Sequence, residues 1–344
     1  FGGNVHVSIN GQPAGDQGIQ MEKGKQYALE ATYTTVPIWW NSLVEPSAKM
    51  TWVDVSRDYI KEAIAAAGKA DVVVFCGGIS ASLEGEEMPL EIDGFSHGDR
   101  THIDLPKVQE DLLKALQKTG KPIIYVNFSG SAVALNWEKE NLPAVVQAFY
   151  PGEATGTALA KLLFGEFNPS GRLPVTFYKS VSDLPDFKEY RMEGRTYRYF
   201  KGEPLWEFGY GLSYSAYAYK NLQVPESAIA GNEIKVSVDV TNTGKMDGEE
   251  VVQVYVTDKD ASVPVPVRSL AGFKRVMLKA GETKKVEIIL KPESFSLIDQ
   301  NYNRIIEPGK FVVSAGGQQP DEKVIAAGQA VQKEIEITNI DRVQ

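Results

Sequence analysis

The segment Asp71–Arg100, DVVVFCGGISASLEGEEMPLEIDGFSHGDR, joins an apolar strand to an acidic loop and decides much of the fold. Residues 72–75 form an uninterrupted apolar run, which is typical of a strand that is covered on both faces. Gly77 and Gly78 let the chain turn out at its end. The lone Cys76 is predicted to be a buried apolar filler. The sequence therefore predicts a buried strand that leads directly into a loop.

The loop after this strand carries Glu84, Glu86 and Glu87 within four residues, followed by Asp99 and Arg100. In open α/β sheets, ligands bind outside the carboxyl ends of the strands. Carboxyl groups crowded together raise one another's pKa, which can keep one of them protonated for proton donation. We expect Asp99 and Arg100 to form a bidentate pair that holds the far end of the loop. An ordinary solvated acidic loop is the alternative interpretation.

Helices and strands alternate around this segment. Such a series implies a parallel sheet covered by helices, because parallel strands are joined by right-handed crossovers. The expected elements are a helix over 59–67, a strand over 71–76, a helix opened by Pro106, strands within 122–131 and 144–153, and a helix over 155–165.

Polar residues follow two of the later strands and are expected at the same edge of the sheet as the acidic loop. They are Asn127, Ser129 and Ser131 after one strand, and residues 150–153, YPGE, after the next. Single residues of these types are often caps or turns, so they are candidates for ligand contacts rather than assigned ones.

The regions on either side are rich in strand patterns. Residues 1–53 predict short strands with an Asn10–Gly11 turn, which indicates a small β module. Residues 217–318 show alternating strands separated by turns about every ten residues, which indicates a β-sandwich. A connector over 179–216 precedes the sandwich, and a weakly patterned tail over 319–344 is expected to hold at most one short strand. Trp39, Trp40 and Trp52 could stack on sugars, although such side chains are more often core anchors.

Composition excludes several classes of function. The formal net charge of −9 argues against a nucleic-acid partner, and no run approaches the roughly 18 apolar residues of a membrane helix. The opening residues 1–11 lack the pattern of a signal peptide. His6, His97 and His102 lack metal-ligand spacing, so we expect neither a metal nor a cofactor.

The acidic loop resembles a known family. LEGEE followed by GDRTHIDLP is similar to the acid/base loop of family 3 glycoside hydrolases, with Glu84 and Glu86 at its two glutamates, Asp99–Arg100 at its D-R and Leu105–Pro106 at its L-P. GRLPVTFY, GRTYRYF and PLWEFGYGLSY are similar to the segment that joins the α/β domain of this family to its final domain. The resemblance implies that Glu86 is the general acid/base and that Glu84, Glu87, Asp99 and Arg100 lie around the substrate. The long insertion from Glu87 to Gly98 leaves the choice among Glu84, Glu86 and Glu87 open.

The resemblance also implies a domain plan of α/β and all-β parts. Residues 1–53 would be the remnant of an inserted β module, 54–178 an α/β sandwich domain and 217–318 a fibronectin type III-like domain. The N-terminal barrel of the family, which carries the nucleophile, would be missing. Asp183 in the Ser182–Asp183 pair does not match that nucleophile.

The function implied is that of the C-terminal portion of a retaining, exo-acting β-glycosidase, a β-glucosidase or β-xylosidase, that is inactive alone. Its partners would be the missing barrel and a β-linked glucoside or xyloside, and its location would be periplasmic or secreted. A non-catalytic carbohydrate-binding or scaffold protein is the alternative, and one half of a split enzyme is another.

Overall fold

The computed structural model describes two compact units, Phe1–Tyr59 and Ile60–Gln344. The described residues are 3–14, 20–35, 57–81, 83–85, 87, 88 and 90–342. Glu86 and the three tryptophans Trp39, Trp40 and Trp52 lie outside them. Within the described ranges, no helix has the length and apolar character needed to span a membrane.

The first unit contains a three-stranded antiparallel sheet of β1 (Gly3–Ile9), β2 (Gln12–Pro13) and β3 (Leu29–Thr35), in the order β2-β1-β3. Asn10 and Gly11 turn the chain between β1 and β2, both with positive φ (52° and 76°). Two-residue hairpin turns of this kind favour Asn-Gly because both residues must adopt the left-handed region. The predicted turn is confirmed.

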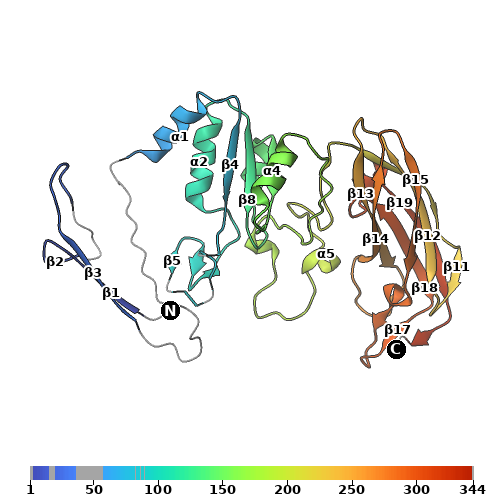
Figure 1. Ribbon diagram of the computed structural model, residues 1–344. Helices are drawn as coiled ribbons and strands as arrows, with labels where there is room; N and C mark the ends of the chain where they lie inside the picture. The colour runs from blue at the N-terminus through green and yellow to red at the C-terminus, as the bar shows by residue number, and fades with distance from the viewer. Residues whose placement is uncertain are drawn as a thin grey trace. The chain divides into compact units, whose positions relative to one another are not determined.

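The second unit begins with a parallel sheet of order β4-β8-β9. Its strands are β4 (Val73–Gly78), β8 (Ile123–Phe128) and β9 (Ala144–Gln147). Its helices are α1 (Tyr59–Ala67), α2 (Lys107–Gln117), α3 (Asn136–Asn141) and α4 (Thr155–Leu163), and α2 and α4 flank the sheet in Figure 1. The predicted parallel, helix-covered sheet is confirmed; the short α3 is an addition to it.

The core of this sheet includes side chains of α2 and β8. Leu113 and Leu116 of α2 belong to the same buried cluster as Ile123 and Tyr125 of β8, and all four side chains are at most 4% exposed. Burying side chains of this size contributes about 1.5–3 kcal/mol each to folding. The parallel pairing of β4 with β8 places their carboxyl ends side by side, with Gly78 opposite Phe128.

The prediction that β4 is buried on both faces is wrong. Val73 and Phe75 pack toward the core, but Val72 and Val74 are 46% and 47% exposed, and Cys76 is exposed as well. An apolar run is compatible with burial on either face, and β4 is an edge strand of the described sheet. Cys76 is therefore an accessible thiol rather than a buried filler.

Glu138 of α3 is a buried carboxyl group in this domain. Its residue is 2% exposed, and its Oε1 has no hydrogen-bond partner among the described residues. Burial raises the pKa of Glu138 from 4.5 to about 7; nearby Glu110 and Asp104 add to the rise, and Lys114 opposes it. The folded state therefore retains a proton that the unfolded state loses.

This raised pKa makes stability pH-dependent in a defined direction. The raised pKa of Glu138 adds to the free energy of unfolding below pH 4.5, and this contribution is lost as the pH rises from 4.5 through about 7. We expect Glu138→Gln to raise the melting temperature at pH 8 and to change it little at pH 4.5. Calorimetry at both pH values tests this prediction, and an equal shift at the two would contradict it.

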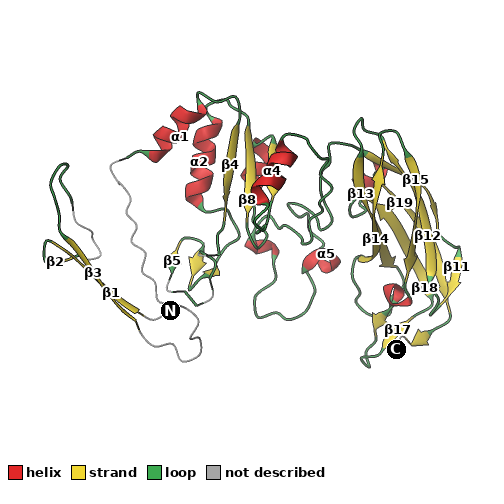
Figure 2. Cartoon of the chain, viewed as in Figure 1, coloured by secondary structure: helices red, strands yellow, loops and turns green. Residues whose placement is uncertain are grey.

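The chain then changes from mixed helices and strands to a region built almost wholly of strands (Figure 2). One sheet has the order β10-β12-β15, and the other has the order β11-β19-β18-β13-β14. The strands of these two sheets are β10 (Tyr217–Gln223), β11 (Ser227–Ile229), β12 (Ile234–Asn242), β13 (Gly248–Asp258), β14 (Ser269–Leu278), β15 (Thr283–Leu290), β18 (Gly309–Gly316) and β19 (Ala330–Thr338). A third small sheet joins β16 (Leu297–Ile298), β17 (Arg304–Ile306) and β20 (Asp341–Arg342) after a 3₁₀ turn, η2 (Pro292–Phe295).

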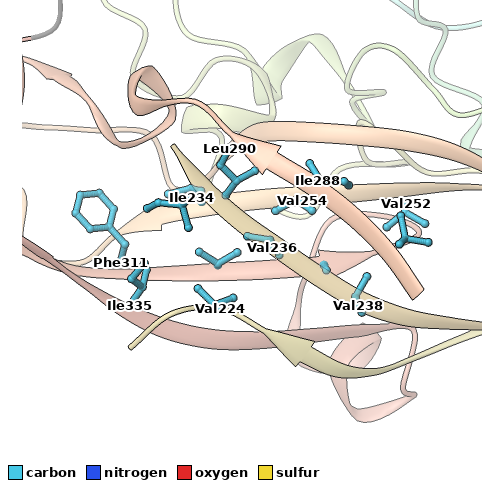
Figure 3. Close-up of a cluster of buried hydrophobic side chains, with 14 of the residues drawn as sticks. Val224, Ile234, Val236, Val238, Val252, Val254, Ile288, Leu290, Phe311 and Ile335 are labelled. Atoms are coloured by element: carbon cyan, nitrogen blue, oxygen red, sulfur yellow. The ribbon is translucent and has the colours of Figure 1, made fainter. Parts of the chain in front are cut away.

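The sandwich core lies between the two larger sheets. Figure 3 draws buried side chains of both sheets, among them Val236 and Leu290 of one sheet and Val254 and Phe311 of the other, which belong to one cluster. All four side chains are at most 2% exposed. Alternate residues of β15 are buried, as the period-2 pattern predicts, whereas the central strand β13 is buried on both faces from Glu250 to Val256. The predicted sandwich is confirmed.

Residues after Gln318 are part of the sandwich rather than a loose tail. They form α6 (Glu322–Ala326) and the nine-residue β19, which pairs with both β11 and β18. Ile335 and Ile337 of β19 are buried in the core, while the preceding run of polar residues 332–334 hides the alternation in the sequence. The expectation of only a short strand here is wrong.

The connector contains a 3₁₀ turn, η1 (Val181–Asp183), and the short helix α5 (Thr196–Tyr199). Asp183 Oδ2 accepts hydrogen bonds from the backbone N–H groups of Lys179 and Ser180 at 3.0 and 3.2 Å. This capping box is a structural use of the Asp183 carboxylate.

Candidate functional site

The acidic loop leaves the sheet through a constrained glycine. Gly78, at the end of β4, has φ of +125°, and a side chain there would collide with the backbone of Phe128. The Gln109 side chain donates to the Gly78 carbonyl and accepts from its N–H, both at 2.7 Å. Gln109 belongs to the first turn of α2, so the helix that follows the loop also sets the direction in which the loop begins.

The inserted segment folds back on the LEGEE motif. It forms a small antiparallel sheet of β5 (Glu91–Ile92), β6 (Phe95–Ser96) and β7 (Asp99–Arg100), which lies beyond the carboxyl end of β4 in Figure 1. Gly98 has φ of +88°, and a side chain there would collide with the carbonyl of Gly85. Gly98 at the end of the insertion therefore lies directly against Gly85 of the motif.

Arg100 lies under the loop, where it binds backbone carbonyls. Its Nε donates to His102 O at 3.0 Å and its Nη2 to Asp104 O at 3.1 Å, whereas its buried Nη1 has no partner among the described residues. Burial lowers the pKa of the Arg100 guanidinium, and the negative charges of Glu84 and Asp104 oppose that effect.

The predicted ion pair between Asp99 and Arg100 is wrong. Asp99 is exposed, and none of the ion pairs among the described residues joins it to Arg100. The two residues are neighbours on β7, and successive side chains of a strand point to opposite faces. The far end of the loop is held by the carbonyl bonds of Arg100 instead.

Glu84 is fixed by the loop that follows β8. Ser131 Oγ donates to Glu84 Oε1 at 3.1 Å, and Glu84 is half-buried. Behind Ser131, the Ser129 hydroxyl donates to the Ser131 carbonyl at 2.8 Å, and the Asn127 Nδ2 donates to the Ser129 hydroxyl at 3.0 Å. Asn127 and Ser129 are fully buried, so a chain of hydrogen bonds runs from the end of β8 to the acidic loop.

The loop after the third strand, β9, also contributes to the carboxyl edge of the parallel sheet. Tyr150, in the loop after β9, donates its hydroxyl to the Ile79 carbonyl at 2.7 Å, and its ring leaves no room for a side chain at Gly130. Residues 151–153 are exposed, and no hydrogen bond among the described residues links their side chains to the acidic loop. The ends of all three strands therefore meet around Ile79 and Glu84.

The structure brings together only some of the predicted site residues. Glu84, Arg100 and Ser131 lie at one place, whereas the Glu87 side chain is exposed on a left-handed residue (φ 52°). Glu86 lies outside the described residues, between the described Gly85 and Glu87. Sequence reasoning missed the roles of Gln109 and Gly98. A glutamine within a helix carries no local signal, whereas the glycine directly before Asp99–Arg100 is a residue type that favours a turn.

His97 and His102 lie beside carboxylates. His97 Nδ1 lies 3.0 Å from Glu91, and His102 lies 3.5 Å from Asp93 and 3.4 Å from Asp104. Over the part of the chain that the structure describes, no group of three metal-ligating side chains gathers.

Comparison with known proteins gives two domain matches. Residues 3–214 match the glycosyl hydrolase family 3 C-terminal domain, and residues 250–319 match a fibronectin type III-like domain. A xylan 1,4-β-xylosidase of Xylanibacter ruminicola is 45% identical over 308 residues, which covers 88% of this chain and 34% of the relative. A periplasmic β-glucosidase of Salmonella typhimurium is 37% identical over 75% of this chain and 34% of the relative.

Solved structures are similar over most of the chain. A β-glucosidase of Erythrobacter marinus aligns with a TM-score of 0.72 and 35% identity, covering 86% of this chain and 38% of that structure. A β-glucosidase of Listeria innocua in complex with gluconolactone aligns with a TM-score of 0.69 and 29% identity, over 86% of this chain and 40% of that structure. The chain therefore spans between a third and two fifths of the length of these relatives.

Proposed function

This chain belongs to glycosyl hydrolase family 3, and we propose that it is the C-terminal portion of a retaining, exo-acting β-glycosidase and supplies its general acid/base carboxylate. The observation that carries the proposal is the anchoring of Glu84 and Gly85, two described residues of the LEGEE motif, at the carboxyl edge of the sheet. Ser131 holds Glu84 from one side, and Gly98 packs against Gly85 from the other. A loop fixed in this way can present a carboxyl group in a constant position.

Within the motif, Glu86 is the proposed acid/base. Glu84 already accepts a hydrogen bond from Ser131 and faces the charge of Arg100, which suits a residue that positions the loop and binds substrate. Glu87 has an exposed side chain, and it and Asp99 are proposed to contact substrate from the rim. The Nη1 of Arg100, which has no hydrogen-bond partner among the described residues, is a donor that a sugar hydroxyl can use.

The proposed mechanism uses two carboxyl groups. Glu86 first protonates the departing glycosidic oxygen and then removes a proton from the water that cleaves the glycosyl-enzyme. The nucleophile stands about 5–5.5 Å from the acid/base in retaining enzymes and would come from the barrel domain of the family. This division of labour requires no metal or cofactor.

The substrate class follows from the relatives. They include a xylan 1,4-β-xylosidase and β-glucosidases, so we propose a β-linked xyloside or glucoside as the substrate. One of these relatives is named as periplasmic, and we propose a periplasmic or secreted location for this protein.

A turnover assay tests the division between two domains. This chain alone should show no appreciable hydrolysis of 4-nitrophenyl β-xyloside or β-glucoside, because it supplies only one of the two carboxyl groups. Joining or mixing it with a barrel domain of the family should give turnover, and the barrel alone serves as the control. Robust hydrolysis by this chain alone would contradict the proposal.

A further inference from the structure

A cavity of about 440 Å³ lies between the connector and the β-sandwich, within the second unit. Its walls come from Thr176, Tyr197, residues 200–204 and Glu207 on one side and from Val267, Arg268, Gln319, Asp321 and Lys323 on the other, and none of its lining residues belongs to the acidic loop. The volume falls in the range of about 300–1,000 Å³ that is usual for small-molecule sites.

The aromatic wall of the cavity is held rigid by its neighbours. The Tyr197 ring stacks on Phe208, with centroids 4.2 Å apart and planes 13° apart, and the Tyr197 hydroxyl accepts a hydrogen bond from Leu270 N at 3.1 Å. The Phe200 ring packs edge-on against Tyr178 at 5.1 Å. Such a preformed apolar surface is ready to stack on a ligand without reorganising first.

Two polar groups of the cavity have no partner. Thr176 is 8% exposed, and its buried Oγ1 makes no hydrogen bond to any described residue. The partly buried Glu207 carboxylate likewise accepts no hydrogen bond from the described residues, and burial raises its pKa, with Asp321 adding to the rise and Arg268 opposing it. Buried polar groups are normally paired, so both are suited to a bound ligand.

Two other polar side chains of the cavity are fixed by hydrogen bonds. Gln319 accepts from Arg268 Nη1 at 3.2 Å and donates to Phe208 O at 2.9 Å, and Asp321 caps α6 through Val324 N at 2.6 Å. These bonds fix this side of the cavity, while the exposed Lys201 and Lys323 lie at its rim.

The charges around the cavity balance. Lys201, Arg268 and Lys323 supply three positive charges, and Glu203, Glu207 and Asp321 supply three negative charges. A cavity with no excess of either sign favours a neutral ligand over an ion. Hydroxyl groups to pair with Glu207 and Thr176, and an apolar face to pack on the aromatic wall, are the features of a sugar ring.

We infer that this cavity is a second carbohydrate site, which binds one or two sugar units without acting on them. Glu207 and Thr176 bind the hydroxyl groups, and Tyr197 and Phe200 provide the apolar contact. The ligand touches the connector and the sandwich at once, so its binding stabilises their packing.

Binding of sugars to this chain, measured by saturation-transfer NMR and calorimetry, tests the inference. The probes are xylose, glucose, xylobiose and cellobiose, and the expected dissociation constant is on the order of millimolar. Glu207→Gln keeps the shape of the side chain but removes its charge, and it should weaken binding about tenfold or more. Thr176→Val should weaken it as well. Glu287→Gln is the matched control, because exposed Glu287 is paired with Lys235 at 2.8 Å and does not line the cavity, and it should leave binding unchanged.

The probes also distinguish the source of the ligand. Stronger binding of the disaccharides indicates the end of a glycan chain, and equal binding of monosaccharides indicates a free sugar. No binding of any probe at roughly 50 mM, well above a millimolar dissociation constant, would overturn the inference. Unchanged binding by folded Glu207→Gln and Thr176→Val variants would overturn it too. The assay needs no turnover, and Glu84→Gln should not affect it, so its result is independent of the proposed acid/base role.

Discussion

Replacing Glu86 with glutamine is expected to lower kcat/KM by about 10²- to 10⁴-fold toward a β-linked disaccharide, in a protein that joins this chain to a barrel domain of its family. The departing sugar is a poor leaving group, so the bond breaks readily only if its oxygen is protonated. Glutamine keeps the shape of the side chain but has no proton to donate. Steady-state kinetics with xylobiose and cellobiose measure the loss.

Other glutamates of the loop provide the controls for this prediction. Glu91→Gln is the matched surface control, because Glu91 lies on the same inserted segment and binds Ser96 and His97 rather than the LEGEE motif. It should change kcat/KM little. If Glu84→Gln or Glu87→Gln causes the large loss and Glu86→Gln does not, the acid/base assignment moves to that residue and the present one is wrong.

Replacing Arg172 with alanine is expected to lower the free energy of unfolding by about 3–5 kcal/mol, because it leaves a buried carboxylate without its partner. Arg172 Nη2 binds Glu250 Oε2 at 2.7 Å, with side chains 10% and 2% exposed. Arg172 Nε donates to Gly317 O at 3.1 Å, and Tyr219 donates to the other Glu250 oxygen at 2.6 Å. Burial raises the pKa of Glu250, and Arg172 opposes that rise.

Two comparisons make the stability prediction specific. Arg275→Ala removes a half-exposed pair with Glu249 at 3.1 Å and should cost no more than about 1 kcal/mol. Arg172→Met should also lower the free energy of unfolding, because it too leaves the Glu250 carboxylate unpaired. Adding Glu250→Gln to this variant should recover part of the loss, since no unpaired charge then stays buried. Denaturant unfolding measures all of these variants, and equal losses for Arg172→Ala and Arg275→Ala would contradict the importance of the buried pair.

Local patterns in the sequence predict most of the elements. The helical spacing over 59–67 and the apolar run over 123–128 match α1 and β8, and Asn10–Gly11 forms the turn that its residue types favour. The family motifs are confirmed by the two domain matches. These features depend on neighbours within a few residues, so a single sequence is enough to recognise them.

Features that depend on distant contacts could not be predicted in the same way. An apolar run does not say which face of β4 is covered, and so the exposure of Val74 and Cys76 was unexpected. Arg172 meets Glu250 and Gly317 at separations of 78 and 145 residues, which no local pattern reveals. At the candidate site, the sequence pointed to the glutamates, but the bonds that fix Glu84 and Arg100 come from side chains and carbonyls that only the fold brings close.

The dependence of kcat/KM on the leaving group tests the central claim most directly. A series of aryl β-xylosides or β-glucosides whose phenols differ in pKa should be compared for the parent protein and its Glu86→Gln variant. Loss of the proton donor should affect poor leaving groups strongly and acidic phenols little, so the variant should show a much steeper dependence on the phenol pKa. Parallel lines for the two proteins would mean that Glu86 does not protonate the leaving oxygen, and would contradict the account.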